Sequence, residues 1–204
     1  MSCKINGVQN GPLILECAEN MLFKDGKQVE KENPAYLCRC GDSKNKPFCD
    51  GTHEKVGFSS KREISEEIIQ VYEGKKITVN FNRSICAGAA NCVHGLPSVF
   101  TSDKSTNWIY PDKDSNDKII KTVNSCPSGA LSYSIKGKVT IDKRTEIKIS
   151  IVKNGPYVVE GVKLEGMPTP TNFSTTKYTL CRCGHSKNRP FCDYSHAENN
   201  WSDE

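Results

Sequence analysis

The feature that most constrains this chain is a cysteine-rich stretch that occurs twice. It reads CRCGDSKNKPFCDGTH from Cys38 to His53 and CRCGHSKNRPFCDYSH from Cys181 to His196. Each copy holds three cysteines and one histidine at identical spacing, C-x-C-x8-C-x3-H. Because stretches this similar are expected to form the same local structure, the fold has to accommodate two like units.

The repeat extends ahead of the cysteines. NGPLILE begins at Asn10 and NGPYVVE at Asn154, at nearly the same distance before each cysteine stretch. Apolar and β-branched residues alternate with polar ones around each Asn-Gly-Pro turn, over residues 4–16 and 147–162, which predicts a hairpin in each copy. Each repeat is therefore a unit of about 50 residues, with strands first, then a cysteine loop, then a short segment that starts at the histidine.

A different unit lies between the copies. We predict a strand at KITVNF, a small-residue loop leading into a short helical turn at RSICAGAANCVHGLPSVF, and a short strand at NWIYP. SNDKIIKTVNSC has apolar residues at helical spacing, with Ser115 as the N-cap, and LSYSIKGKVTID predicts a hairpin that turns at residues 136–138. Residues 59–74 are charged, and their pattern leaves helix and strand both open.

These segments predict an α+β chain in four parts. They are a first β-rich repeat unit at residues 1–58, a connector at 59–75, a small inserted α+β unit at 76–145 and a second repeat unit at 146–204. Only 36% of the residues are hydrophobic, which argues against a single large core.

The count of eleven cysteines indicates metal or redox chemistry if the chain is cytosolic. Nine of them fall into three groups of three, which suggests three sites, while Cys3 and Cys17 stand apart and are interpreted as free thiols. We expect a cytoplasmic protein because the N-terminal residues do not resemble a signal peptide. The absence of a basic run argues against nucleic-acid binding, and the absence of a long apolar run argues against a membrane span.

The chemistry of the repeated stretch follows from its spacing. A set of three cysteines and one histidine commonly holds zinc, but zinc sites usually take C-x2-C or wider pairs. A C-x-C pair in an extended segment can chelate one iron, and Cys49 and His53 lie about one helical turn apart, able to chelate a second. Two irons with two protein ligands each is the geometry of a [2Fe-2S] cluster.

The stretch resembles the CDGSH (NEET) iron–sulfur family, whose signature is C-x-C-x2-[ST]-x3-P-x-C-D-G-x-H. The first copy fits throughout, and the second departs only at Tyr194, where the family has glycine. The resemblance implies that each C-x-C pair holds one iron of a cluster and each Cys-His pair the other. The ligands would be Cys38, Cys40, Cys49 and His53 in the first copy, and Cys181, Cys183, Cys192 and His196 in the second.

The resemblance also carries an expectation about architecture. Single-motif members of the family pair two chains that share a β-cap, and two copies in one chain can do the same internally. We therefore expect the hairpins at Asn10 and Asn154 to pair across a pseudo-twofold axis, giving an intrachain pseudo-dimer with a β-cap and cluster loops. Such a chain is expected to be a monomer.

Polar residues of the stretch have expected roles. Asp50 and Asp193 stand where an N-cap belongs, just before the turn that carries the histidine. Ser43 and Ser186 are expected to hydrogen-bond a cluster sulfide or a cysteine sulfur. Prolines stiffen each loop and basic residues offset the cluster charge; these are Pro47, Pro190, Lys44, Lys46, Lys187 and Arg189.

The inserted unit carries the third cysteine group, Cys86, Cys92 and Cys126-Pro127. Its stretches ICAGAANCVHGLPSVF and CPSGALSY resemble the divergent mono-cluster ferredoxin domain, with Ala89 at the central position of the usual cysteine run. Three thiolates imply a [3Fe-4S] cluster, or a [4Fe-4S] cluster with one ligand that is not cysteine. His94 is the nearest candidate for that ligand, although a surface or packing histidine is the commoner interpretation; loss of the cluster remains an alternative for the whole unit.

These observations predict an electron-transfer protein rather than an enzyme. The sequence has no dinucleotide fingerprint, Walker lysine loop or nucleophile elbow. Its partner would be a redox protein, or an apo-protein acceptor if the chain instead senses iron or transfers [2Fe-2S] clusters. A zinc-loaded structural module is the third alternative. Histidine ligation further predicts that acid releases the clusters and that His53→Cys or His196→Cys slows the release.

Overall fold

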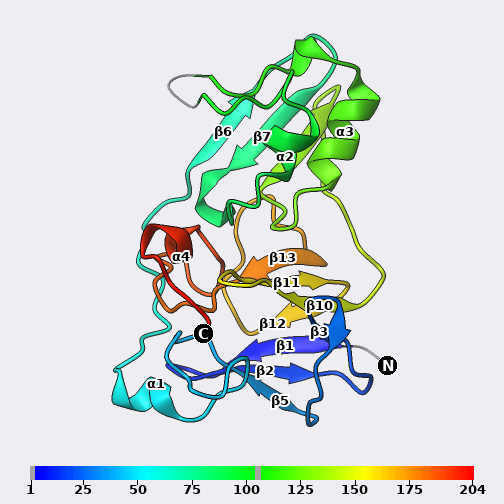
Figure 1. Cartoon of the computed structure of the whole chain (residues 1–204). Helices are drawn as coiled ribbons and strands as arrows, with labels where there is room; N and C mark the ends of the chain where they lie inside the picture. The colour runs from blue at the N-terminus through cyan, green and yellow to red at the C-terminus, as the bar shows by residue number, and fades with distance from the viewer. Residues whose placement is uncertain (1–2, 104–106) are drawn as a thin grey trace.

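The computed structural model describes residues 3–103 and 107–204 and shows a mixed α+β protein built mostly from β-sheets (Figure 1). The helices are short, and three separate sheets account for the strands. Two of these sheets come from the repeats and the third from the segment between them.

The first sheet forms around the hairpin predicted at Asn10. Leu13 and Leu15 are fully buried while Ile14 and Glu16 are half-buried, which is the alternation expected of a strand with one face on the core. Asn10 takes a positive φ of 53°, a conformation that asparagine tolerates in turns. The strand order is β12-β1-β2-β5, with β1 at Lys4–Gly7, β2 at Leu13–Glu16, β5 at Ala35–Leu37 and β12 at Lys163–Glu165.

The second sheet repeats this pattern around Asn154, whose φ is 51°. Tyr157 and Val159 are buried and their neighbours Val158 and Glu160 half-buried. The strand order is β13-β11-β10-β3-β4, with β3 at Leu22–Lys24, β4 at Lys27–Gln28, β10 at Lys148–Ile151, β11 at Tyr157–Glu160 and β13 at Lys177–Leu180.

The expectation that the two hairpins pair with each other was wrong. They lie in different sheets, and each is extended by a strand from the other repeat. Strand β12 of the second repeat pairs in parallel with β1, with Lys4 opposite Lys163, and β3 of the first pairs in parallel with β10, with Leu22 opposite Ile149. This reciprocal exchange covers the hairpin edge that would otherwise present unpaired backbone groups.

The third sheet, β6-β7-β8-β9, belongs to the segment between the repeats. The predicted hairpin turns at Lys136-Gly137, both at positive φ, and KITVNF forms a strand as predicted. The predicted strand at NWIYP is only an isolated bridge between Phe100 and Ile109. The strands are β6 at Ile69–Tyr72, β7 at Thr78–Asn82, β8 at Leu131–Ile135 and β9 at Lys138–Thr140.

Helices lie beside this sheet, and a short helix also follows each cysteine loop. Ser115 precedes the longest helix as predicted, but its side chain makes no capping hydrogen bond. Residues 59–74 form no helix and contribute only strand β6. The α-helices are α1 at Thr52–Lys55, α2 at Asn91–Gly95, α3 at Asn116–Asn124 and α4 at Ser195–Glu198, and 3-10 turns occupy Arg83–Ile85 (η1) and Pro111–Lys113 (η2).

Cys3 and Cys17 form a disulfide, which corrects their interpretation as free thiols. Strands β1 and β2 pair with Lys4 opposite Glu16, so the next residues outward, Cys3 and Cys17, also face each other. Their Cα atoms lie 4.4 Å apart, close enough for the bond. The two cysteines are equidistant from Asn10 at the hairpin turn, a signal already present in the sequence.

Figure 1 places the inserted unit at one end of the molecule, beside α4 and far from α1. Lys177 of β13, only 1% exposed, joins this unit to the second repeat. Its ammonium group lies 2.7 Å from an Asp142 carboxylate oxygen and donates to the Asn124 carbonyl. None of the helices in the described parts of the chain is long and apolar enough to span a membrane.

Candidate iron–sulfur sites

Each cysteine loop is closed on itself by backbone hydrogen bonds. The Cys38 amide donates to the Pro47 carbonyl at 2.8 Å, and the Cys49 amide to the Tyr36 carbonyl at 2.8 Å. The second loop makes the same bonds, from Cys181 to Pro190 and from Cys192 to Thr179. Pro47 and Pro190 both follow cis peptide bonds. The backbone hydrogen bonds fold each loop back on the strand that precedes it and bring the third cysteine near the first two.

The predicted ligands come together in pairs. The Cys38 and Cys40 Sγ atoms lie 3.6 Å apart, and Cys49 Sγ lies 3.3 Å from His53 Nδ1. The second copy gives the same distances, 3.6 Å for Cys181 and Cys183 and 3.3 Å for Cys192 and His196.

These distances suit two ligands of one metal ion. Metal–thiolate bonds of about 2.3 Å and metal–imidazole bonds of about 2.0 Å give tetrahedral edges of about 3.8 Å and 3.5 Å. Among residues 3–103 and 107–204, no group of three or more His, Cys, Asp or Glu side chains is placed to hold a single metal ion. Each Cys-Cys or Cys-His pair is thus spaced to hold one metal ion by itself.

Surrounding groups favour the thiolate form of one cysteine in each C-x-C pair. Interaction with the Cys40 thiol lowers the pKa of Cys38 to about 6, against the effect of burial and with help from the Ser43 and Gly41 amides. The same contacts lower the pKa of Cys181 to about 7. The same interaction raises the pKa of the other cysteine in each pair, Cys40 and Cys183, so one thiolate per pair, the form that binds metal, is favoured.

The polar residues of the loops act on the backbone. The expected N-cap role of Asp50 and Asp193 was wrong, because Gly51 and Tyr194 occupy the N-cap positions. Asp50 instead accepts hydrogen bonds from the Thr52 and Lys44 amides, at 3.0 and 2.8 Å, just before the turn that carries His53. Asp193 makes the equivalent bonds in the second copy. Ser43 donates to the Phe48 carbonyl at 2.6 Å rather than to a cysteine sulfur, so its expected bond to cysteine is not what the structure shows. Ser186 likewise donates within its loop, to the Phe191 carbonyl.

The two repeated sites meet at their second cysteines. Cys40 and Cys183 form an antiparallel bridge between the loops. Next to them, Gly41 and Gly184 have φ values of 91° and 76°, and a Cβ on either would overlap the carbonyl oxygen of the opposite cysteine. Only glycine allows this close backbone approach, which joins the sites without any intervening side chain.

An arginine stands between the first two cysteines of each loop. Arg39 donates to the Gly11 and Val8 carbonyls, and Arg182 donates to the Val152 and Gly155 carbonyls, so each guanidinium holds the hairpin turn of its own repeat. Arg182 also pairs with Asp203 at 2.8 Å, and both side chains are 2% exposed. Burial lowers the pKa of Arg39 to about 10, and the charge of Cys181 partly opposes this effect, so Arg39 stays charged at neutral pH.

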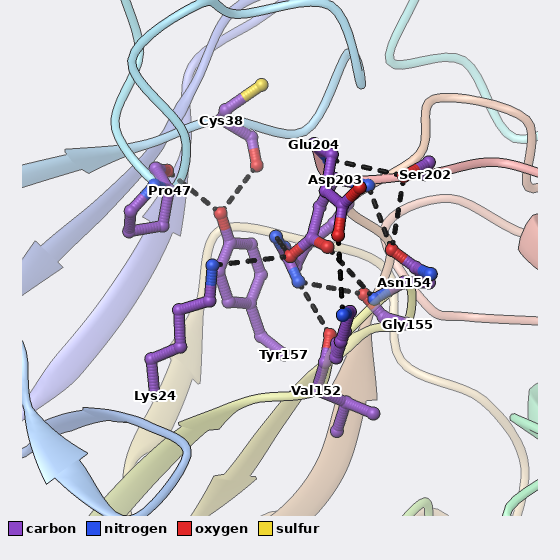
Figure 2. A network of polar contacts seen from close by, with 12 residues as sticks. Lys24, Cys38, Pro47, Val152, Asn154, Gly155, Tyr157, Ser202, Asp203 and Glu204 are labelled. Carbon is purple, nitrogen blue, oxygen red and sulfur yellow. Dashed lines mark hydrogen bonds and ion pairs between the residues drawn. The ribbon is translucent and has the colours of Figure 1, made fainter.

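Tyr157 reaches from the second repeat to the first cysteine loop. Figure 2 shows its hydroxyl facing Cys38 and Pro47, and it lies 2.8 and 3.0 Å from their carbonyl oxygens. Tyr157 is 1% exposed. The corresponding residue of the first repeat is Leu13, which has no hydroxyl, so the two sites differ at this point.

Replacing Tyr157 with phenylalanine is expected to lower the free energy of unfolding by about 1 to 2 kcal/mol, because a buried hydroxyl bonded to two carbonyls is lost. Chemical denaturation of the apo chain measures the change. Leu13→Met, a substitution of similar volume at the corresponding position, serves as the control and is expected to cost less than about 1.5 kcal/mol. If Tyr157→Phe costs nothing, the hydroxyl does not support the first loop.

The third cysteine group forms one cradle in the inserted unit. Cys86, Cys92 and Cys126 line the same small cavity together with residues 87–90, a glycine and three alanines. Desolvation is the main cause that raises the pKa of Cys92 to about 11, and Cys126 and Cys86 add to it. His94 is exposed on α2 and does not line this cavity. The structure thus brings the three cysteines together without the candidate fourth ligand.

The third cradle packs against the second repeated site. The Tyr194 ring lies where a Cβ on Gly88 would fall, and Arg83 donates to the Asp193 carbonyl at 3.2 Å. Asn188 donates to the Ser84 carbonyl at 2.7 Å. Tyr194 has a φ of 82°, matching Gly51 at 85° in the first copy, and its ring lies 5.5 Å from that of His196. The one departure from the motif thus lies at the contact between two sites.

Comparisons with known proteins agree with this arrangement. A family model described as "Iron-binding zinc finger CDGSH type" matches residues 10–54 and 154–197, and one described as "Divergent 4Fe-4S mono-cluster" matches residues 72–136. The protein YjdI of Escherichia coli K12, whose name calls it uncharacterized, is 43% identical over 65 residues, which are 32% of this chain and 84% of YjdI. YjdI of Escherichia coli O157:H7 gives the same figures. No solved structure matches the chain.

Proposed function

Because the chain belongs to the CDGSH iron–sulfur family and carries a divergent 4Fe-4S mono-cluster domain between its two CDGSH segments, we propose that it is a multi-cluster electron-transfer protein. It would hold two [2Fe-2S] clusters and one [3Fe-4S] or [4Fe-4S] cluster. When bound, such clusters supply one-electron chemistry. Ligation by a single histidine raises the reduction potential of a cluster above that of an all-cysteine cluster.

The ligand assignment follows the pairs described above. The first [2Fe-2S] cluster would be held by Cys38, Cys40, Cys49 and His53, and the second by Cys181, Cys183, Cys192 and His196. Cys86, Cys92 and Cys126 would hold the third cluster. The spacing within each pair suits two ligands of one tetrahedral metal ion, and the C-x-C pattern, narrower than the usual zinc pairs, favours two irons per CDGSH site over one zinc ion.

The observation that carries the proposal is the continuity of the three sites. The Cys40–Cys183 bridge joins the two CDGSH loops, and the packing of Tyr194 on Gly88 joins the second loop to the cradle of the inserted unit. Burial is the main cause that raises the pKa of Cys192, and Cys86 adds a smaller electrostatic effect, as expected of neighbouring sites. The side chains that we assign as ligands therefore form one connected series, which suits the passage of electrons through the chain.

The architecture that we propose is an intrachain pseudo-dimer with a ferredoxin-like insert. The reciprocal exchange of β3 and β12 supports it, because equivalent strands are traded in both directions, as they would be between two subunits. A chain whose hairpin edges are paired with its own strands is expected to act as a monomer. We propose no catalysed reaction and no nucleic-acid partner.

The partner that we propose is a redox protein in the cytoplasm. The six cysteines of the two CDGSH loops form no disulfide, so all six can bind iron as thiolates. A reducing compartment keeps cysteines free of disulfides. The Cys3–Cys17 disulfide lies apart from them, at the outer end of the first hairpin.

Anaerobic EPR with iron and sulfide analysis tests the cluster content. We expect a red-brown protein with about seven or eight irons per chain, depending on the type of the third cluster. The double variant Cys181→Ala, Cys183→Ala should lose about two irons, and Cys86→Ala should affect only the signal of the third cluster. A colourless chain that binds zinc stoichiometrically would overturn the proposal.

Mixing the loaded chain with an apo-ferredoxin separates two roles. An electron carrier keeps its clusters, whereas a [2Fe-2S] donor transfers them to the acceptor. We expect retention, measured as iron that stays with the chain after the proteins are separated. Transfer on the timescale of minutes would favour the cluster-transfer function instead.

A further inference from the structure

A cavity of about 420 Å³ lies between the first repeat, the connector and the second cysteine loop. Four of its lining residues are basic, namely Arg39, Lys61, Arg62 and Arg189, and none is acidic. The Phe58 ring lies within 6 Å of two of their guanidinium groups, at 5.4 Å from Arg39 and 5.8 Å from Arg189, and so fixes both heads from one side. The cavity is therefore built by residues from five separate stretches of both repeats and the connector.

The positive charge around this cavity is only partly balanced. Arg189 pairs with Glu63, and Arg62 pairs with Glu67 at 2.9 Å. Neither Arg39 nor Lys61 forms an ion pair with any residue in the described part of the chain. The Nε atoms of Arg62 and Arg189 are buried donors that lack a partner within the same residues, a state that usually indicates an unaccounted ligand or water.

The second repeat shows how the chain neutralises the equivalent arginine. There Asp203 accepts from the Asn154 amide and pairs with Arg182. Ser60 occupies the corresponding position of the first repeat, and its hydroxyl accepts from the Asn10 amide. The serine keeps the bond to the hairpin turn but provides no carboxylate. One side-chain difference between the repeats thus leaves Arg39 without its counter-charge.

We propose that this cavity binds a small organic anion that carries a phosphate group. Guanidinium groups recognise phosphate through paired hydrogen bonds, and the Lys61 ammonium adds further donors. Val8, Met167 and Pro168 line the remaining wall with apolar surface. The volume lies within the range of small-molecule sites and exceeds what the phosphate group alone needs. This inference does not depend on the cluster types.

Titration calorimetry of the purified full chain with phenyl phosphate tests the proposal. We expect saturable binding of one molecule per chain that weakens as salt is added, because charge attraction drives it. Inorganic phosphate should bind at the same place more weakly, since it does not use the apolar wall. Equal affinity for both probes would mean that a free phosphate is the ligand and would overturn the organic part of the proposal.

Ser60→Asp restores the carboxylate found in the second repeat. We expect it to weaken phenyl phosphate binding about tenfold or more, since it neutralises Arg39 and repels the anion. Ser60→Asn, of similar size but uncharged, should bind nearly as the unmodified chain does. Lys61→Glu should also weaken binding, while Lys121→Glu on the remote helix α3 should not.

The thermal midpoint of each variant shows whether it folds. The absence of saturable binding to the unmodified chain would overturn the proposal, and so would equal binding by folded Ser60→Asp and Ser60→Asn. If Ser60→Asp does not fold, the comparison of Lys61→Glu with Lys121→Glu decides in the same way, because both lysines are exposed. Failure of these tests leaves the EPR result on the clusters unaffected.

Discussion

Replacing Asp203 with asparagine is expected to lower the free energy of unfolding by about 3 kcal/mol, because it strands a buried charge. The Arg182 guanidinium is 2% exposed and Asp203 is its carboxylate partner, as part of the network in Figure 2. Asparagine can still accept from the Asn154 amide, so the hairpin contact survives. The hydrogen bonds from Arg182 to two backbone carbonyls keep the loss near the lower limit for a broken buried pair.

Chemical denaturation at neutral pH measures this loss. Glu204→Gln is the matched control, since Glu204 is the next residue and its ion pair with Lys153 is exposed, 79% and 62% respectively. The control should change stability by less than about 0.5 kcal/mol. An Asp203→Asn chain as stable as the control would mean that Arg182 does not need its carboxylate.

The same ion pair predicts how stability depends on pH. Burial alone would raise the pKa of Asp203, but Arg182 and the Asn154 amide bring it below its ordinary value of 3.8. A carboxyl group with a lowered pKa in the folded state contributes its stability above the ordinary pKa and loses it as the pH falls through the lowered value. The difference between the unmodified chain and Asp203→Asn should therefore narrow below about pH 4.

Replacing Gly184 with alanine is expected to lower the free energy of unfolding by about 3 to 4 kcal/mol and to disturb both CDGSH sites at once. The new Cβ would overlap the carbonyl of Cys40, and backbone atoms there cannot move aside without separating the loops. The φ of 76° adds conformational strain. Denaturation of the apo chain measures the stability, and iron analysis should show loss from the first site as well as the second.

Gly51→Ala is the control for strain alone. Gly51 has a φ of 85°, but a Cβ there would meet no atom within 4 Å, so the cost should be only about 1 kcal/mol. Similar losses for Gly184→Ala and Gly51→Ala would contradict the close crossing of the two loops at Cys40 and Cys183. Loss of iron from the second site alone would contradict the coupling between the sites.

Local features of this chain could be predicted from its sequence because they depend on neighbouring residues. Turn residues and alternation located the two hairpins, and motif spacing paired Cys49 with His53. Helix α3 and the Lys136-Gly137 turn follow from periodicity and from the residues that tolerate positive φ. The ligand roles themselves stay predictions.

Features that join distant segments were not predictable in the same way. The exchange of β3 and β12 depends on which hairpin edge is free once the hairpins have formed. The periodicity of the sequence does not indicate which strand pairs with that edge. The Tyr157 hydroxyl acts on a loop in the other repeat, so its role is invisible until both repeats are placed. Aligning the two repeats is enough to show that Ser60 corresponds to Asp203. The effect of this difference on charge can be judged only once Arg39 and Arg182 are known to be buried.

The exchanged strands also impose an order on synthesis. Strand β1 leaves the ribosome before its partner β12, which follows about 150 residues later; at about 5–20 residues per second this is a delay on the order of ten seconds. During that interval the β1 edge that later pairs with β12 stays open, because β2 pairs with the other edge of β1 and β5 pairs with β2. The first repeat is thus completed by a strand of the second repeat, so a chain truncated before β12 cannot complete its first sheet.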